Sequence, residues 1–258
     1  MSLADFNLDS FSLTGKNAIV TGGNSGLGQA FSVALATAGA NIFVPSIVAG
    51  QGETKRLVEA KGSRYHYANV DITAEGVAQQ SVLDCQQLYG SVDILVNCAG
   101  ISLLADVESF GREQWDRMVQ VNLTAAFEFS HHAAKGMIEQ GRGKIINICS
   151  LFSFLGGRES PAYAATKHGI AGLTKAYCDE LAQYNVQVNG IAPGYFDTAL
   201  TQNSMNDPVA KQKILEHIPA GKVGCVSDLM GAAVFLASEA SNYVNGHILT
   251  VDGGYLVR

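Results

Sequence analysis

The sequence has no excess of positive charge and no long apolar run, and these absences limit its partners. Lys and Arg number 17 against 23 Asp and Glu, which gives a formal net charge of −6 at pH 7. Without a basic stripe, binding to nucleic acid or to an anionic membrane surface is not expected. No apolar run approaches the roughly 20 residues that a membrane span needs. We therefore expect a small-molecule partner, with no nucleic acid and no membrane.

Paired cysteines and a basic N-terminal segment are absent too. The five cysteines are odd in number and include no Cys-x-x-Cys pair, and three of them (Cys98, Cys149 and Cys178) lie in apolar surroundings. We interpret these three as free, buried thiols in a reducing compartment. The chain carries no basic residue before Lys16, so we expect no secretory signal and a cytoplasmic location.

What the chain does have is a regular alternation of short apolar runs with amphipathic stretches. With 258 residues, 47% hydrophobic residues and 28 glycines, it suits one globular core and not a disordered chain. Strands that alternate with helices favour a parallel sheet covered on both faces. We predict a single α/β domain over residues 1–258, a doubly wound Rossmann-type sheet with seven strands at 16–21, 41–46, 64–70, 92–97, 144–149, 186–192 and 248–251.

A glycine-rich turn, Gly22 to Gly28 (GGNSGLG), follows the first predicted strand and precedes an amphipathic stretch at 29–38. Glycines allow positive φ angles and let a backbone approach a pyrophosphate closely, and a helix N-terminus offers free N–H groups. The sequence lacks the Gly-Lys-[Ser/Thr] of a P-loop. The turn therefore indicates a dinucleotide site.

The end of the second predicted strand bears on the choice of coenzyme. Folds that bind NAD usually place an acid there for the ribose 2′-hydroxyl, and those that bind a 2′-phosphate place an arginine. This chain has Ser46 and Ile47, and it has no Lys or Arg between Lys16 and Lys55. We interpret the coenzyme as NAD and leave NADP open.

Other polar residues near predicted strand ends have two interpretations each. Asp71 could meet an adenine edge or stand beside the next helix N-terminus. Asn97, followed by Cys-Ala-Gly100, could face a ligand or make structural hydrogen bonds. The segment at 193–220 has no clear strand pattern, and a long loop in a compact domain is usually functional, so we predict a substrate lid there.

A helix predicted at 113–139 is apolar on most sides, which indicates burial by another subunit. Asn122 lies in its middle, where a polar side chain needs a partner. His131 and His132 are adjacent and have no second ligand pair at metal spacing, so no metal site is expected.

A serine, a tyrosine and a lysine follow the fifth predicted strand. Ser160 and Pro161 predict a helix start, so Tyr163 and Lys167 lie one turn apart on one face. A positive charge beside a phenol favours its ionised form, which makes Tyr163 a candidate general acid or base. Alone, the Tyr163 and Lys167 pair is better interpreted as an exposed helix pair, and Ser150 at the strand end could equally be a turn serine.

Taken together, these motifs resemble those of the short-chain dehydrogenase/reductase family over essentially the whole chain from residue 13. Asn122, Ser150, Tyr163 and Lys167 match its catalytic tetrad. The resemblance implies a Rossmann fold, hydride transfer with a nicotinamide coenzyme, and a homotetramer. It also implies a coenzyme site formed by Thr21, Gly22, Asn24, Ser25, Gly26, Leu27, Gly28, Ser46, Asp71, Ile72, Asn97, Ala99, Gly100, Tyr163, Lys167, Pro193, Gly194 and Thr198.

The resemblance implies a role for each member of the tetrad. Tyr163 exchanges the proton with the substrate oxygen, and Ser150 holds that oxygen by a hydrogen bond. Lys167 favours the ionised phenol and grips the nicotinamide ribose, and Asn122 anchors a water that links Lys167 to solvent. Cys98 departs from the family pattern, which usually has a second Asn at that position.

Within the family, the sequence is most similar to bacterial sugar-acid dehydrogenases. The first subgroup is 2-deoxy-D-gluconate 3-dehydrogenase, also described as acting at C5 of 2-keto-3-deoxygluconate. Gluconate 5-dehydrogenase comes second. A polyol dehydrogenase and a non-catalytic dinucleotide-binding regulator are the alternatives, the latter because a fold alone does not fix a function.

The paired arginines that such relatives often carry after the fourth strand are absent, because residues 101–105 read Ile-Ser-Leu-Leu-Ala. Arg158 could hold the substrate carboxylate instead, or it could be an exposed loop arginine near Glu159. Arg258 is the next candidate. The predicted substrate contacts are Ser102, Arg158 and Tyr195.

Overall fold

The computed structural model describes residues 7–198, 201 and 205–258. Its centre is a seven-stranded sheet in the order β3-β2-β1-β4-β5-β6-β7, and every pairing is parallel. The predicted Rossmann-type sheet is confirmed. The strands are β1 (Asn17–Val20), β2 (Asn41–Ser46), β3 (Tyr65–Asn69), β4 (Ile94–Asn97), β5 (Gly143–Ile148), β6 (Val186–Pro193) and β7 (Ile248–Val251).

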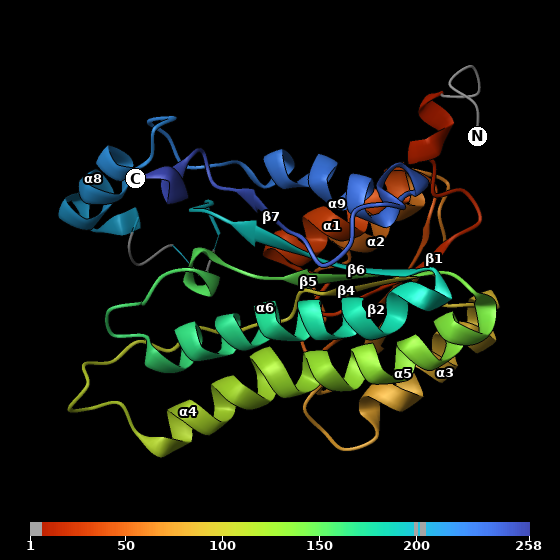
Figure 1. Cartoon of the computed structure of the whole chain (residues 1–258), viewed down its shortest axis with the longest axis horizontal. Helices are drawn as coiled ribbons and strands as arrows, with labels where there is room; N and C mark the ends of the chain where they lie inside the picture. Colours follow the sequence, from red (N-terminus) through yellow and green to blue (C-terminus); the bar gives the residue numbers. More distant parts are fainter. Residues whose placement is uncertain (1–6, 199–200, 202–204) are drawn as a thin grey trace.

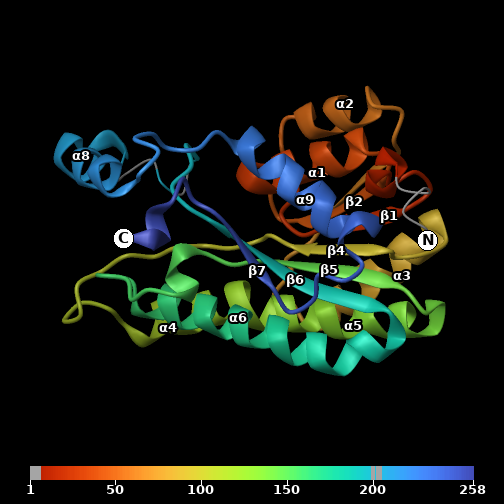
Figure 2. The ribbon, with the colours of Figure 1, turned by 45° about the horizontal axis from the view of Figure 1, so that its top comes forward.

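Helices cover both faces of the sheet, as Figures 1 and 2 show. One face is covered by α1 (Gly26–Thr37), α2 (Glu53–Glu59) and α9 (Met230–Ala237). The other face is covered by α3 (Val77–Tyr89), α5 (Ala125–Gln140) and α6 (Pro161–Leu181). Two more helices, α4 (Arg112–Val119) and α8 (Pro208–His217), lie toward the end of the molecule where the strands terminate. No helix in the described part of the chain is long and apolar enough to cross a membrane.

Successive residues of a strand face opposite sides of the sheet, so their side chains pack into two separate hydrophobic cores. Val20 and Val96 pack with Phe31, Leu35 and Leu236 on the α1 and α9 side. Their strand neighbours pack on the α3 and α5 side, in a cluster that includes Ile19, Phe43, Leu95, Ile145, Phe129 and Met137. Burial on both faces explains why the strands read as nearly continuous apolar runs in the sequence.

The long helix predicted at 113–139 is wrong as a single element. Helix α4 ends at Val119, a π-helical turn spans Gln120–Thr124, and α5 begins at Ala125. A π turn accommodates one extra residue per turn, which breaks the helical repeat and redirects the side chains around it. Asn122 lies within this turn and is 2% exposed. Trp115 and Phe127 are 38% and 42% exposed in the single subunit.

The structure refines the prediction for the thiols. Of the three thiols predicted to be buried, Cys149 is buried, while Cys98 and Cys178 are partly exposed.

The segment predicted as a lid at 193–220 is not a structureless loop. It contains α8, whose N-terminus is capped by Asp207 through a 2.9 Å bond from the N–H of Val209. Residues 199, 200 and 202–204 of this segment lie outside the described residues.

Candidate active site

The carboxyl ends of the strands meet along one edge of the sheet, and the strand order reverses between β1 and β4. Ligands of open α/β sheets bind at such a switch point. Thr21, directly after β1, bridges it: its Oγ1 accepts hydrogen bonds from the N–H groups of Cys98 (3.0 Å) and Ala99 (3.1 Å). The glycine-rich turn and the residues after β4 are therefore held as one unit.

The glycine-rich turn has the backbone shape that its sequence predicts. Gly22 and Gly26 have φ angles of +66° and +49°, which L side chains rarely adopt. A Cβ on Gly28 would lie 2.3 Å from the carbonyl oxygen of Gly22. The turn thus brings bare backbone to the N-terminus of α1, where Ser25 is the N-cap residue but makes no side-chain cap. This cradle suits the pyrophosphate of a dinucleotide.

A buried side chain from the turn fixes the loop after β2. Asn24 is 5% exposed, and its Nδ2 donates to the carbonyl oxygens of Val48 (2.9 Å) and Ala49 (3.3 Å). Its Oδ1 accepts from the hydroxyl of Tyr65, whose pKa burial raises to about 12. Ser46 accepts from the N–H of Val48 (3.1 Å). In the described part of the chain, no cationic side chain makes an ion pair or a hydrogen bond with Ser46 or Asn24.

The structure excludes one of the two interpretations of Asp71, the cap of the next helix, and leaves its adenine contact as a prediction. Asp71 is exposed and closes a local turn, accepting from the N–H (2.9 Å) and hydroxyl (2.7 Å) of Thr73, and these bonds lower the pKa of its carboxyl. It does not cap α3, whose N-cap is Gly76. Its neighbour Ile72 packs against the core on the α3 side.

The amide nitrogen of Asn97 makes structural hydrogen bonds. Its Nδ2 donates to Asn147 Oδ1 (2.8 Å) and Ser130 Oγ (2.9 Å), away from the strand ends and toward α5 and β5. The amide nitrogen of Asn97 is therefore used inside the core, while its Oδ1 has no hydrogen-bond partner among the described residues, and a coenzyme contact at this residue stays a prediction. The two positions that follow, Ala99 and Gly100, remain at the switch point.

Ser150 follows β5 by two residues and is oriented by its own turn. Its Oγ accepts from the N–H of Phe152 (3.2 Å), within a 3-10 turn at Leu151–Ser153. A hydroxyl has one hydrogen to donate and two lone pairs. With the Phe152 N–H on one lone pair, the hydroxyl hydrogen of Ser150 is left for another acceptor.

Helix α6 carries Tyr163 and Lys167, one turn apart as predicted. They are 9% and 5% exposed, and the Lys167 ammonium lies 5.6 Å from the centre of the Tyr163 ring. Lys167 Nζ also donates to the carbonyl oxygen of Ile148, the last residue of β5, at 2.6 Å. An ammonium has three donors, so two remain. Among the described residues, the Tyr163 hydroxyl has no hydrogen-bond partner; Phe152 packs edge-on against its ring.

Asn122 is joined to the same helix by a residue that sequence reasoning missed. Its side chain clasps the backbone of Ile101, accepting from the N–H (2.8 Å) and donating to the carbonyl (2.9 Å). Its Nδ2 also contacts Thr166 Oγ1 (3.3 Å), which donates to the carbonyl of Tyr163 (2.8 Å). Thr166 is 1% exposed, and its polar side chain directly before Lys167 was the signal available in the sequence.

Two thiols lie near Lys167 and stay protonated. Burial raises the pKa of Cys98 to about 12 and that of Cys149 to about 11, although Lys167 opposes the shift in both. Near pH 7 neither thiol is a thiolate, so neither competes with Tyr163 for the positive charge.

The predicted substrate contacts differ in how exposed they are. The side chain of Arg158 is 91% exposed, and its Nε pairs with Glu159 Oε1 at 3.3 Å, which is the surface placement; its contact with a substrate stays a prediction. The guanidinium of Arg258 donates to the carbonyl of Glu216 (3.1 Å). Tyr195, after β6, is partly buried against Tyr255, and burial raises its pKa to about 12. Ser102 is partly buried in the segment after β4.

The end of β6 packs tightly on β7. A Cβ on Gly194 would lie 2.6 Å from Asp252 Cα, so the glycine after Pro193 is required by close backbone packing. The N–H of Thr198 donates to Thr201 Oγ1 (3.2 Å), which begins the segment leading to α8.

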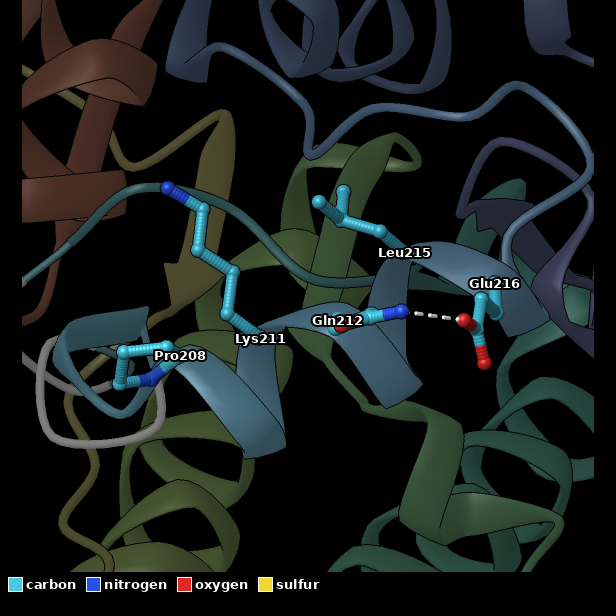
Figure 3. Close-up of a pocket in the computed structure, with 5 residues that line it drawn as sticks. All are labelled: Pro208, Lys211, Gln212, Leu215 and Glu216. Carbon is cyan, nitrogen blue, oxygen red and sulfur yellow. Dashed lines mark hydrogen bonds between the residues drawn. The ribbon is translucent and has the colours of Figure 1, made fainter.

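A hollow of about 470 Å³ lies along α8 (Figure 3), lined by Pro208, Lys211, Gln212, Leu215 and Glu216. All of its lining residues come from that one helix, and Gln212 is bonded to Glu216 at 2.9 Å. No member of the predicted tetrad lines it, so we place the candidate active site at the strand ends and not here.

We expect Gly28→Ala to weaken NADH binding by at least about tenfold, because the methyl group would stand 2.3 Å from the Gly22 carbonyl oxygen, and displacing backbone there deforms the cradle. Fluorescence titration with NADH measures the change. Gly231→Ala is the matched control, since a Cβ there meets nothing within 4 Å. Wild-type affinity in the Gly28 variant would show that the turn does not hold the coenzyme.

Comparisons with known proteins agree with this geometry. The family model described as short chain dehydrogenase matches residues 16–208. The uncharacterized oxidoreductase YgcW of Escherichia coli (strain K12) is 64% identical over 257 residues, which cover 100% of this chain and 98% of the relative. A 2-dehydro-3-deoxy-D-gluconate 5-dehydrogenase of Bacillus subtilis (strain 168) is 46% identical, with 97% of this chain and 98% of the relative covered.

A solved structure is similar over almost the full length. It is a protein of Agrobacterium tumefaciens, provisionally named 2-deoxy-D-gluconate 3-dehydrogenase, with bound NADP. Its TM-score is 0.91 at 44% identity, covering 96% of this chain and 99% of that one. With the family model matched over most of the chain and the fold shared, this chain belongs to the short-chain dehydrogenase family.

Proposed function

We propose that the chain interconverts a secondary alcohol and a ketone of a sugar acid by hydride transfer to or from NAD(P). The observation that carries this proposal is the Ser150, Tyr163 and Lys167 arrangement at the end of β5, beside the glycine cradle of the switch point. Substrates of the 2-deoxygluconate or 2-keto-3-deoxygluconate type fit the names of the relatives. Gluconate, oxidised at C5, is the second candidate.

The residues present suit a nicotinamide dinucleotide. The cradle between Gly22 and Gly28 would hold its pyrophosphate, and the two remaining Lys167 donors would reach its ribose hydroxyls. When bound, the coenzyme supplies or accepts the hydride. Every other part of the reaction falls to side chains of this chain.

Tyr163 is proposed as the general acid for ketone reduction and the general base for alcohol oxidation. Its hydroxyl is free of protein partners among the described residues, so it can donate to or accept from the substrate oxygen. The nearby ammonium stabilises negative charge on the phenol oxygen when the proton leaves. Ser150 donates its remaining hydrogen to the same substrate oxygen and holds it within reach of Tyr163.

A panel of sugar acids and polyols, followed at the absorbance of reduced nicotinamide, tests the function. Turnover of 2-keto-3-deoxygluconate or 2-deoxygluconate above that of neutral polyols supports a sugar-acid dehydrogenase. Preference for polyols would make it a polyol dehydrogenase. Binding of NADH with no turnover of any panel member would favour a non-catalytic dinucleotide-binding regulator.

We predict a preference for NAD(H) over NADP(H) of at least about tenfold in kcat/KM. A 2′-phosphate near Ser46 needs a charged partner, and a charged hydrogen bond is worth about 1.5–3 kcal/mol. The Asn24 amide is already committed to the carbonyls of Val48 and Ala49, and Lys55 is paired with Glu59 at 3.8 Å. Steady-state kinetics with both coenzymes measure the ratio. Equal efficiency would mean that a cation folds back onto the phosphate.

We predict a homotetramer, in the cytoplasm. The prediction rests on the family resemblance and on two large aromatic side chains, Phe127 on α5 and Trp115 on α4, that are 42% and 38% exposed in one subunit. Light scattering at micromolar concentration should give four times the chain mass of 27.2 kDa. A monomer under these conditions contradicts the prediction.

A further inference from the structure

We propose that Ser153, outside the predicted tetrad, is a positioning residue that locks the Ser150 turn to the helix bearing Tyr163 and Lys167. The inference rests on the proposed function. Ser153 is 6% exposed, and its Oγ donates to the carbonyl oxygen of Lys167 at 2.8 Å. The same Oγ accepts from the N–H of Ser150 at 3.2 Å. One hydroxyl therefore spans the backbones of two proposed catalytic residues.

Among the described strands, the backbone N–H of Ser150 has no partner, and Ser153 Oγ accepts its hydrogen bond. The sheet ladder ends one residue earlier, where the N–H of Cys149 donates to Ile191 of β6 at 2.8 Å. The next N–H along the chain, that of Ser150, has left the ladder, and buried N–H groups are costly when unpaired. Ser153 supplies the acceptor that the neighbouring strand no longer provides.

The bridge completes a reciprocal set of bonds around Ser150. The N–H of Ser153 donates to the Ser150 carbonyl (3.0 Å), and Ser150 Oγ accepts from the N–H of Phe152 (3.2 Å). Two contacts join the turn at Leu151–Ser153 to α6: the ring of Phe152 packs on that of Tyr163, and the hydrogen bond from Ser153 Oγ to the Lys167 carbonyl fixes the backbone. Because Tyr163 lies one turn from Lys167, these two contacts set where the Ser150 hydroxyl stands relative to the phenol.

Small displacements of this kind lower the rate of the chemical step more than they lower coenzyme binding, because proton transfer depends steeply on the distance between the atoms. We expect Ser153→Ala to reduce kcat by about tenfold or more, while the dissociation constant for NADH stays within about threefold. Ser153→Cys, close in volume but a weak hydrogen-bond donor, should show the same split.

Two measurements separate this role from general stability. Hydrogen–deuterium exchange of the peptide spanning residues 150–154 should rise in Ser153→Ala, and this readout needs no substrate. The Ser150→Ala and Ser150→Ala/Ser153→Ala variants should then have kcat values within about threefold of each other, because Ser153 acts through Ser150.

Ser63→Ala is the matched control: Ser63 is 7% exposed, donates to the carbonyl of Ala36 at 3.1 Å, and lies before β3. Its loss should leave kcat unchanged.

The proposal is overturned if exchange at 150–154 does not change, if Ser153→Ala keeps kcat within twofold of the wild type, or if the double variant is a further tenfold slower than Ser150→Ala. Kinetic ratios are taken with whichever substrate of the panel the wild type turns over. Failure on sugar acids alone would therefore count against the proposed substrate and not against Ser153.

Discussion

Tyr163→Phe should lower kcat by about 10²–10⁴-fold, the usual contribution of a positioned general acid or base. The substitution removes one oxygen and keeps the ring, whose edge-on contact with Phe152 at 5.8 Å supports the fold of the site. The phenol oxygen makes no hydrogen bond to the described protein, so its loss leaves no buried partner unpaired. NADH affinity, measured by fluorescence titration, should stay within a few-fold.

Tyr243→Phe is the matched control for this prediction, because that side chain is fully exposed and the change again removes one hydroxyl. Its kcat should equal that of the wild type. If Tyr163→Phe kept more than a tenth of the wild-type kcat, another group would have to carry the proton, and the proposed mechanism would fail at its central step.

Much of the fold could be predicted from the sequence because the strands are buried on both faces. The central strands β1, β4, β5 and β6 are short buried runs, and stretches with helical periodicity separate them, so the succession of strands and helices could be predicted; the edge strand β3 is polar and half exposed. The glycine turn could also be located, because the +66° of Gly22 and the close approach at Gly28 exclude other residue types. In the buried strands and in the glycine turn, the residue types that the local backbone favours are also the ones that the packing of the fold requires.

The features that escaped prediction depend on contacts between distant segments. The π turn that carries Asn122 has no signature in its own residues; it is held by bonds to Ile101 and Thr166, 21 and 44 residues away. Asn97 could not be assigned from the sequence, since only the position of Asn147 across the β4–β5 register shows where its amide points. Arg158 looked suitable because it lies between Ser150 and Tyr163 in sequence, but the sequence does not show that its guanidinium pairs with Glu159 at the surface.

Lys167→Met should be more damaging than Tyr163→Phe, because it removes two contributions at once. The ammonium stabilises the ionised phenol, and it is the donor proposed for the nicotinamide ribose. A charged hydrogen bond is worth about 1.5–3 kcal/mol, so we expect coenzyme affinity to fall by about tenfold or more in addition to the loss of kcat. The Ile148 carbonyl also loses its 2.6 Å partner.

Lys144→Met provides the matched control, since Lys144 is also buried, with 8% of its surface exposed. It lies at the amino end of β5, whose last residue, Ile148, accepts the hydrogen bond from Lys167. Lys144 Nζ donates to Asn242 Oδ1 (2.9 Å), and burial lowers its pKa to about 8, so it loses its charge at a lower pH than an exposed lysine does. Removing it should alter thermal stability and leave both kcat and NADH affinity unchanged. If Lys144→Met weakened NADH binding as much as Lys167→Met does, the loss would reflect damage to β5 as a whole. Unchanged affinity in Lys167→Met, with kcat reduced, would instead confine Lys167 to its effect on Tyr163 and assign the ribose to other donors.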